Sequence, residues 1–229
     1  MAHILISGAS GGLGQHVTAK FLENGYRVSA FVSHKTDPGF LKHPLLNVYQ
    51  ADLLNATETE EKIVKASETG PGIEAGILLA GGFSMGQLQE TSLNDIEKMY
   101  NLNFVTAYNA TRPLLRILEK QGKGGQIILI GARPVFKPEA ARQMVAYAFS
   151  KSLIFKLAEV INSEGKEHGI TASVIVPSII DTPANRKAMP DSDPASWVTP
   201  EEIAENLLHL MTPAGRKLRK TILKVYGDS

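Results

Sequence analysis

The chain has 229 residues, a length at which a single α/β domain is common. Its 24 lysines and arginines nearly balance 23 aspartates and glutamates, so no general attraction to nucleic acid or an anionic membrane is built in, although a local basic patch stays open. Cysteine is absent, which excludes disulfides, thiolate metal sites and a cysteine nucleophile. We expect one domain over residues 1–229, a cytoplasmic location, and no nucleic-acid or membrane partner.

Short apolar runs alternate with longer amphipathic stretches, which is typical of parallel strands joined by crossover helices. The run Ile127-Ile128-Leu129-Ile130 fits a strand covered on both faces. The predicted fold class is α/β, a Rossmann-type doubly wound parallel sheet of about seven strands with helices on both faces. The strands are expected at His3–Ser7, Arg27–Val32, Asn47–Ala51, Gly76–Ala80, Gln126–Ile130, Thr171–Val176 and Thr221–Val225.

Helices are expected at Leu13–Asn24, Thr57–Ser67, Leu93–Lys120, Gln143–Glu167 and Glu201–Met211. The last of these has a capping box, with Thr199 as N-cap and Glu202 three residues later. Between Pro177 and Pro200, five prolines are expected to break any regular element. Loops this long inside a compact domain are usually functional, so residues 178–200 are predicted to form a substrate lid.

A glycine-rich turn follows the first expected strand, with Gly8, Gly12 and Gly14 in the pattern G-x-x-x-G-x-G. Such a strand-to-helix turn points backbone N–H groups and the positive end of the helix dipole at a bound anion. A tight connection without a ligand is the alternative. The position after the first strand favours dinucleotide binding, with Ser10 and Leu13 in the same turn.

The end of the second strand bears on the choice between NAD and NADP. An NAD site expects an acidic residue there for the ribose 2′-OH, and no carboxylate occurs before Asp37. A 2′-phosphate would instead meet Ser33 as a donor and His34 and Lys35 as cations. A solvated loop with incidental charge is the alternative. The pattern favours NADP, and NAD stays open.

Tyr147 and Lys151 are four residues apart, so both project from one face of the expected helix. A nearby ammonium lowers the pKa of a phenol, which makes it a better proton exchanger. With a nicotinamide as hydride donor, such a tyrosine reduces a C=O or C=N bond without a metal. The six histidines include no pair at helical spacing, so no metal site is expected.

These residues resemble the short-chain dehydrogenase/reductase family over essentially the whole chain. The resemblance implies that Tyr147 and Lys151 are the catalytic pair and that Asn103 positions a proton-relay water beside Lys151. It also implies that Thr182 holds the nicotinamide carboxamide and that Asp52 contacts adenine, although Asp52 can equally cap the following helix. The implied cofactor-binding residues are Gly8, Ser10, Gly12, Leu13, Gly14, Ser33, His34, Lys35, Asp52, Leu53, Ala80, Gly81, Gly82, Tyr147, Lys151, Pro177 and Thr182.

Two departures from the family pattern narrow the interpretation. The family serine that binds a substrate carbonyl is missing from Ile130-Gly131-Ala132-Arg133-Pro134, and the fourth strand leads into Ala80-Gly81-Gly82-Phe83. Both resemble the dihydropteridine reductase branch of the family, as does the stretch from Asp181 to Pro190. Enzymes of that branch resemble NADH-dependent ones, with Asp at the position where this chain has Val32. The sequence therefore decides neither the cofactor nor the substrate.

The resemblance therefore implies an NAD(P)H-dependent oxidoreductase that transfers hydride, with Tyr147 as proton donor and quinonoid dihydropteridine as the favoured substrate. Reduction of another carbonyl compound and a non-catalytic NADP-binding sensor are the alternatives. Trp197 either stacks on a flat substrate or anchors the lid. The apolar stripes of Leu93–Lys120 and Gln143–Glu167 form either a homodimer or homotetramer face or part of the core.

Overall fold

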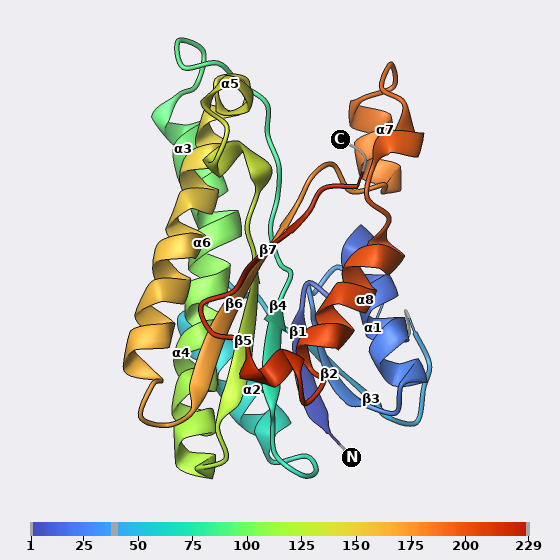
Figure 1. Cartoon of the computed structure of the whole chain (residues 1–229), viewed down its shortest axis with the longest axis vertical. Helices are drawn as coiled ribbons and strands as arrows, with labels where there is room; N and C mark the ends of the chain where they lie inside the picture. The colour runs from blue at the N-terminus through green and yellow to red at the C-terminus, as the bar shows by residue number, and fades with distance from the viewer. Residues whose placement is uncertain (1, 38–40, 228–229) are drawn as a thin grey trace.

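The computed structural model describes residues 2–37 and 41–227 (Figure 1). Both ends of the domain predicted over residues 1–229 lie outside the described residues. A seven-stranded parallel sheet with the order β3-β2-β1-β4-β5-β6-β7 forms the centre, which confirms the predicted fold class. The strands are β1 (His3–Ser7), β2 (Arg27–Val32), β3 (Leu46–Gln50), β4 (Ala75–Leu78), β5 (Gly125–Ile130), β6 (Ile170–Pro177) and β7 (Ile222–Val225).

Helices cover both faces of the sheet and bury an apolar layer on each (Figure 1). One face packs α2 (Ala56–Ser67), α4 (Thr106–Gln121) and α6 (Val145–Glu164), and the other packs α1 (Gly12–Glu23) and α8 (Pro200–Leu210). All five residues of β1 are buried, as expected for a strand covered on both sides.

The predicted helix boundaries follow from local signals. Asn24 is the C-cap of α1 and Gly25 takes the left-handed φ of +76° that ends many helices. At α8 the predicted capping box is confirmed, because the Glu202 N–H donates to Thr199 Oγ1 and the Glu202 carboxylate accepts from the Thr199 N–H.

Two predicted elements differ from the structure. The helix expected at Leu93–Lys120 is divided into α3 (Leu93–Tyr100), a π-helical turn (Asn101–Val105) and α4. The helix expected at Gln143–Glu167 begins at Val145 as α6 and is preceded by a short helix α5 (Pro138–Ala141). Single 3₁₀ turns complete the described helices, at η2 (Arg133–Val135), η3 (Pro194–Ser196) and η4 (Gly215–Lys217).

The prediction that prolines break all regular structure between Pro177 and Pro200 is wrong. Pro183 is the first residue of helix α7 (Pro183–Ala188), and Pro194 is the first residue of η3. Proline is favoured at the first helical position because its fixed φ suits a helix and its missing N–H would have no partner there. These two prolines therefore start elements instead of breaking them.

The strand order indicates where a ligand-binding crevice lies. The chain runs outward from β1 through β2 to β3, and then returns to the other side of β1 at β4. Ligands of open α/β sheets bind beyond the carboxyl ends of the strands where the order reverses in this way. The segments after β1 and β4 therefore frame the candidate site.

Candidate active site

The glycine-rich turn after β1 has a geometry that only glycines allow at two positions. Gly8 has a φ of +67°, and a Cβ there would lie 2.7 Å from the Ala80 nitrogen after β4. A Cβ on Gly14 would lie 2.0 Å from the Gly8 carbonyl oxygen. Helix α1 starts at Gly12 behind an N-cap, Gly11, that offers no side-chain cap. The amide groups at this end of α1 fit a diphosphate, as the sequence predicts.

The predicted cofactor residues gather at the carboxyl edge of the sheet. They follow β1, β2, β3, β4 and β6, and Tyr147 and Lys151 lie near the start of α6. Thr182, the N-cap of α7, lies against the glycine turn, since a Cβ on Gly12 would be 3.0 Å from Thr182 Cγ2. Pro177 is the buried last residue of β6. Leu53 lies after β3, where its carbonyl accepts from Asn109 Nδ2 at 2.9 Å.

A chain of hydroxyl groups lies at the end of β2. Thr36 Oγ1 is 3.0 Å from Ser10 Oγ and 3.2 Å from Ser33 Oγ, and the Thr36 carbonyl accepts from Gln50 Nε2 at 2.8 Å. The sequence analysis missed Thr36, although its spacing of three residues from Ser33 is a turn signal. Three hydroxyls from two separate loops therefore meet where the adenosine ribose of a dinucleotide would bind.

His34 and Asp52 have local partners that the sequence analysis did not foresee. His34 Nε2 lies 2.8 Å from Glu58 Oε1, which leaves Lys35 as the more available cation of this loop. Asp52 accepts from the Leu54 N–H at 3.0 Å, whereas the side chain of Asn55 caps α2. The alternative interpretation of Asp52 as the helix cap is therefore wrong.

Tyr147 and Lys151 lie on one face of α6, with Lys151 Nζ 6.0 Å from the centre of the Tyr147 ring. Lys151 is buried and donates from Nζ to the Ile130 carbonyl at 2.9 Å. Burial lowers the pKa of Lys151 to about 8, and burial also raises the pKa of the Tyr147 phenol. The expectation that Lys151 lowers the pKa of the phenol is therefore wrong: burial raises the pKa of Tyr147, so the phenol stays protonated at neutral pH beside a lysine whose pKa is about 8.

The side chain of Asn103 is fixed by hydrogen bonds to other residues of the chain. Its Oδ1 accepts from the Gly82 N–H at 3.0 Å, and its Nδ2 donates to the Gly82 carbonyl and to Ser150 Oγ, both at 3.1 Å. Ser150 Oγ in turn donates to the Tyr147 carbonyl at 2.8 Å. Asn103 lies in the π-helical turn, a feature that often marks functional sites. We call Asn103, Tyr147, Ser150 and Lys151 the catalytic cluster.

The catalytic cluster is therefore cross-linked between two helices and the loop after β4. Ser150 was not among the predicted site residues, although it stands three residues after Tyr147 on the same helical face. Since the Asn103 side chain already bonds to Gly82 and Ser150, the predicted relay water would depend on the backbone of Asn103. That role stays a prediction.

The surroundings of Tyr147 are aromatic and lack the family serine. Ala132 is buried at the start of the turn where the serine is expected. Phe83 packs edge-on against Tyr147 at a ring distance of 5.1 Å and is still 40% exposed. Arg133 stacks on the Tyr226 ring at 4.9 Å instead of standing free beside the site. Trp197 is only 6% exposed, which favours its role as an anchor over stacking on a substrate.

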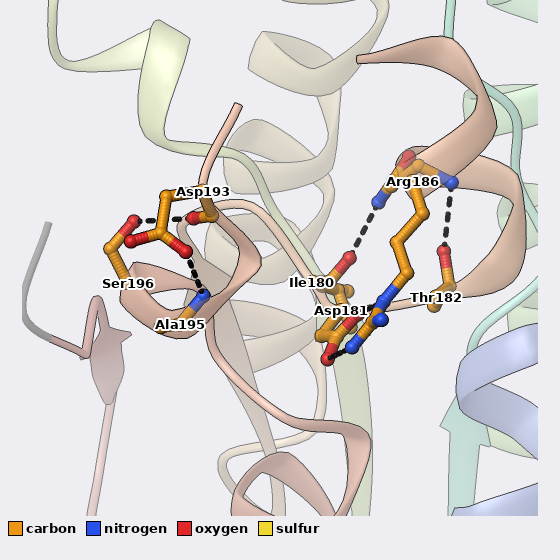
Figure 2. A network of polar contacts seen from close by, with 8 residues as sticks. Ile180, Asp181, Thr182, Arg186, Asp193, Ala195 and Ser196 are labelled. Carbon is orange, nitrogen blue, oxygen red and sulfur yellow. Dashed lines mark hydrogen bonds and ion pairs between the residues drawn. The ribbon is translucent and has the colours of Figure 1, made fainter. Parts of the chain in front are cut away.

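Residues 178–200 stand above the sheet beside the glycine turn and carry α7 (Figure 1). Figure 2 shows Arg186 reaching back to Asp181, with both guanidinium contacts at 2.6 and 2.7 Å. Asn185 bonds to Thr182 and to the Ile180 carbonyl. Asp193 bonds to Ala195 and Ser196 in the same local manner (Figure 2).

Within residues 2–37 and 41–227, no group of three or more histidine or acidic side chains is arranged to hold a metal ion. No helix within these limits combines the length and the apolar character that crossing a membrane requires.

Known proteins resemble this chain in sequence and in fold. The short chain dehydrogenase profile matches residues 2–193. Dihydropteridine reductase from Dictyostelium discoideum is 26% identical over 215 residues, covering 92% of this chain and 87% of the relative. The cyclic-di-GMP-binding biofilm dispersal mediator protein of Escherichia coli K12 is 25% identical over 182 residues, covering 80% and 74%. A structure of ElxO with NADP bound superposes with a TM-score of 0.90 at 21% identity, covering 99% and 97%.

The chain belongs to the short chain dehydrogenase family. This is a family of oxidoreductases that use NAD or NADP, so the predicted family and the prediction of a nicotinamide dinucleotide are confirmed at that level. The glycine turn, which a Cβ at Gly8 or Gly14 would fill, fits such a group. In its presence Gly8, Gly12 and Gly14 would hold the diphosphate, and the bound nicotinamide would supply hydride.

Proposed function

We propose that the chain is an NADPH-dependent reductase in which Tyr147 donates the proton. The observation that carries this proposal is the catalytic cluster, which presents a protonated phenol at the carboxyl edge of the sheet. In the proposed reaction the Tyr147 hydroxyl protonates the acceptor atom as it gains charge. Lys151, whose pKa is about 8, then returns a proton to the phenolate. Asn103 and Ser150 link the backbone of α6 at Tyr147 to the loop after β4.

NADP is the proposed cofactor, on the basis of the loop after β2. Val32 ends that strand without a carboxylate, and the hydroxyls of Ser10, Ser33 and Thr36 offer donors to a 2′-phosphate, with Lys35 as the cation. The NADP complex of the structural relative supports this choice. Lys35→Ala should weaken NADPH binding about tenfold or more and leave NADH binding nearly unchanged, measured by fluorescence titration. His34→Ala is the matched control, because Glu58 already engages that ring.

Quinonoid dihydropteridine is the proposed substrate, a planar and electron-poor ring. The similarity to a dihydropteridine reductase supports it. The partly exposed Phe83 ring beside Tyr147 offers an apolar edge to such a ring, and an electron-poor substrate depends less on the missing serine. The test follows NADPH absorbance with quinonoid dihydropterin and with a panel of aldehydes and ketones. Turnover of only the carbonyl panel would transfer the proposal to another carbonyl compound.

A non-catalytic dinucleotide sensor is the second candidate function. Ala132 in place of the family serine favours it, as does the similarity to a protein that binds cyclic-di-GMP. The same assay separates the two candidates. Tight NADPH binding without turnover of any substrate would favour the sensor, and turnover that Tyr147→Phe abolishes would favour the reductase.

The proposed organisation is one domain in which residues 178–200 act as a lid over the substrate. The contact of Thr182 with Gly12 supports it, since it joins this segment to the dinucleotide turn. Limited proteolysis tests it: NADPH should protect the bonds after Arg186 and Lys187, and equal cleavage with and without cofactor would contradict the lid. The predicted cytoplasmic location stays a prediction.

A homodimer or homotetramer is the proposed assembly. Phe149, Leu153 and Val160 of α6 are 54%, 36% and 44% exposed. The rings of Tyr100, Phe104 and Tyr108 follow one another from the end of α3 through the π turn into α4. Such a patch suits burial between copies. Leu153→Lys should give monomers in analytical ultracentrifugation, and Leu218→Lys, at a similarly exposed site elsewhere, should not.

A further inference from the structure

A basic groove of about 770 Å³ runs along β3, the edge strand of the sheet. It is lined by His34, Leu41, Lys42, His43, Leu46, Asn47, Val48, Tyr49, Gln50, Lys62 and Lys65. Of the described lining residues, three are lysines, two are histidines and none carries a carboxylate. In a chain whose net charge is only +1, this is a local concentration of positive charge.

The lysines of the groove flank both sides of the β3 edge. Lys62 and Lys65 come from α2, whose Ile63 packs into the core on one face of the sheet. Lys42 follows Leu41, which packs against the core on the other face. Within residues 2–37 and 41–227, none of these three lysines forms an ion pair. Their charges are therefore available to a partner.

The backbone of β3 offers hydrogen-bonding groups to the same groove. The Leu45 carbonyl accepts from the Val28 N–H, and the Ala51 N–H donates to the Val32 carbonyl, both at 2.9 Å. The odd-numbered residues therefore bond to β2, and the even-numbered ones direct their peptide groups to the free edge. Leu46 N–H bonds to the His43 carbonyl, which leaves the N–H groups of Val48 and Gln50 facing the groove.

We propose that this groove binds an acidic peptide in extended conformation, which adds to the sheet as an eighth strand beside β3. The outward peptide groups would supply the backbone hydrogen bonds of strand addition. Successive side chains of a strand point to opposite faces, so carboxylates on the peptide would meet Lys62 and Lys65 on one face and Lys42 on the other. A second copy of this chain is a poor occupant, because its β3 edge carries the same lysines.

The first experiment measures fluorescence anisotropy of a labelled nine-residue peptide with glutamates on both strand faces. Binding to the full chain should weaken at least about tenfold between ionic strengths of about 0.01 M and 0.15 M, where screening shortens from about 30 to 8 Å. The double variant Lys62→Glu/Lys65→Glu should lose about tenfold or more at low salt. The matched control Lys98→Glu/Lys166→Glu, with the same charge change away from β3, should lose little.

The second experiment separates strand addition from unspecific attraction. The peptide is N-methylated at alternate positions, in one version on the odd residues and in the other on the even residues. Strand addition requires one set of N–H groups to face β3, so one version should lose binding about tenfold and the other should retain it. Equal binding of both versions, equal loss in the two lysine double variants, or no binding at low salt would overturn the proposal.

Discussion

The catalytic cluster and residues 178–200 are held together in opposite ways. In the cluster, hydrogen bonds join residues far apart in the sequence, since Asn103 bonds to Gly82 and Ser150 and Lys151 bonds to Ile130. In residues 178–200, the side-chain hydrogen bonds of Asp181, Asn185 and Asp193 reach at most five residues along the chain, and those of Asp181 and Asp193 are drawn in Figure 2. The proposed proton-transfer groups are thus fixed by the sheet, whereas the side chains of residues 178–200 bond mainly to one another.

The ends of the segment show where it is attached. Ile180 and Val198 form a parallel bridge, in which the Val198 N–H donates to the Ile179 carbonyl at 2.9 Å and the Asp181 N–H donates to the Val198 carbonyl at 2.8 Å. Trp197 is buried beside this bridge. A segment with one fixed base and only local internal bonds can move as a unit without disturbing the cluster.

The largest expected effect comes from removing the proposed proton donor, Tyr147. Tyr147→Phe keeps the ring and its contact with Phe83 but lacks the hydroxyl, so kcat should fall about 10²- to 10⁴-fold. NADPH binding, measured separately by fluorescence, should change less than about threefold. A kcat near that of the wild-type protein would remove Tyr147 from the mechanism and with it the functional meaning of the cluster.

A second effect concerns the amino ends of the strands, opposite the candidate site. A buried histidine there should make the stability of the fold depend on pH. His3 is fully buried with Nε2 2.9 Å from Ser29 Oγ, and burial together with the nearby Arg27 lowers its pKa from 6.5 to about 4 against the raising effect of Glu74. The unfolded chain therefore binds the proton first. As pH falls from about 6.5 to about 4, the free energy of unfolding should decrease by up to about 3 kcal/mol.

Urea unfolding of wild type and His3→Gln at several pH values checks this contribution. The glutamine variant should be less dependent on pH in that range, and the two proteins should respond alike above pH about 6.5. Parallel pH curves for the two proteins would contradict the assignment. A positive result would also show that an acid-sensitive group of the core, His3, lies away from the catalytic cluster.

The third effect is the pH dependence of the reaction. Lys151 has a pKa of about 8, so above that pH it loses the proton that the proposed mechanism returns to Tyr147. The kcat of reduction should therefore fall up to about tenfold for each pH unit above about 8. In Lys151→Arg the guanidinium does not release its proton, so kcat should be low at every pH and the descending limb near pH 8 should disappear. A descending limb at the same pH in both proteins would assign it to another group.

Most of the fold could be predicted because its signals are local. The continuous apolar runs placed the strands within about two residues, and β1 and β2 match the prediction at both ends. The glycines, the capping box of α8 and the Tyr147–Lys151 spacing also depend only on near neighbours. These features were sufficient to predict from the sequence that the candidate site lies at the carboxyl edge of the sheet.

The features that could not be predicted depend on contacts between distant segments. The π-helical turn contains Asn103, whose side chain bonds to Gly82 and Ser150 far along the chain, and no residue spacing in the sequence predicts it. Glu58 lies 24 residues from His34, so the sequence presented that histidine as a free cation. In residues 178–200 the error was local: the prolines were interpreted as breakers, although Pro183, Pro194 and Pro200 each start a helical element.

The smallest expected effect tests the mobility of residues 178–200 directly. Arg186→Gln removes the exposed pair with Asp181, so the melting temperature should change by less than about 2 °C. Hydrogen exchange of the amides in α7 should nevertheless become about tenfold faster, while those of β4 and β5 stay unchanged. Lys187→Gln, at the neighbouring exposed position, should leave both regions unchanged. Faster exchange throughout the sheet in Arg186→Gln would mean that the segment is part of the fixed region, because a self-contained unit cannot loosen strands it does not support.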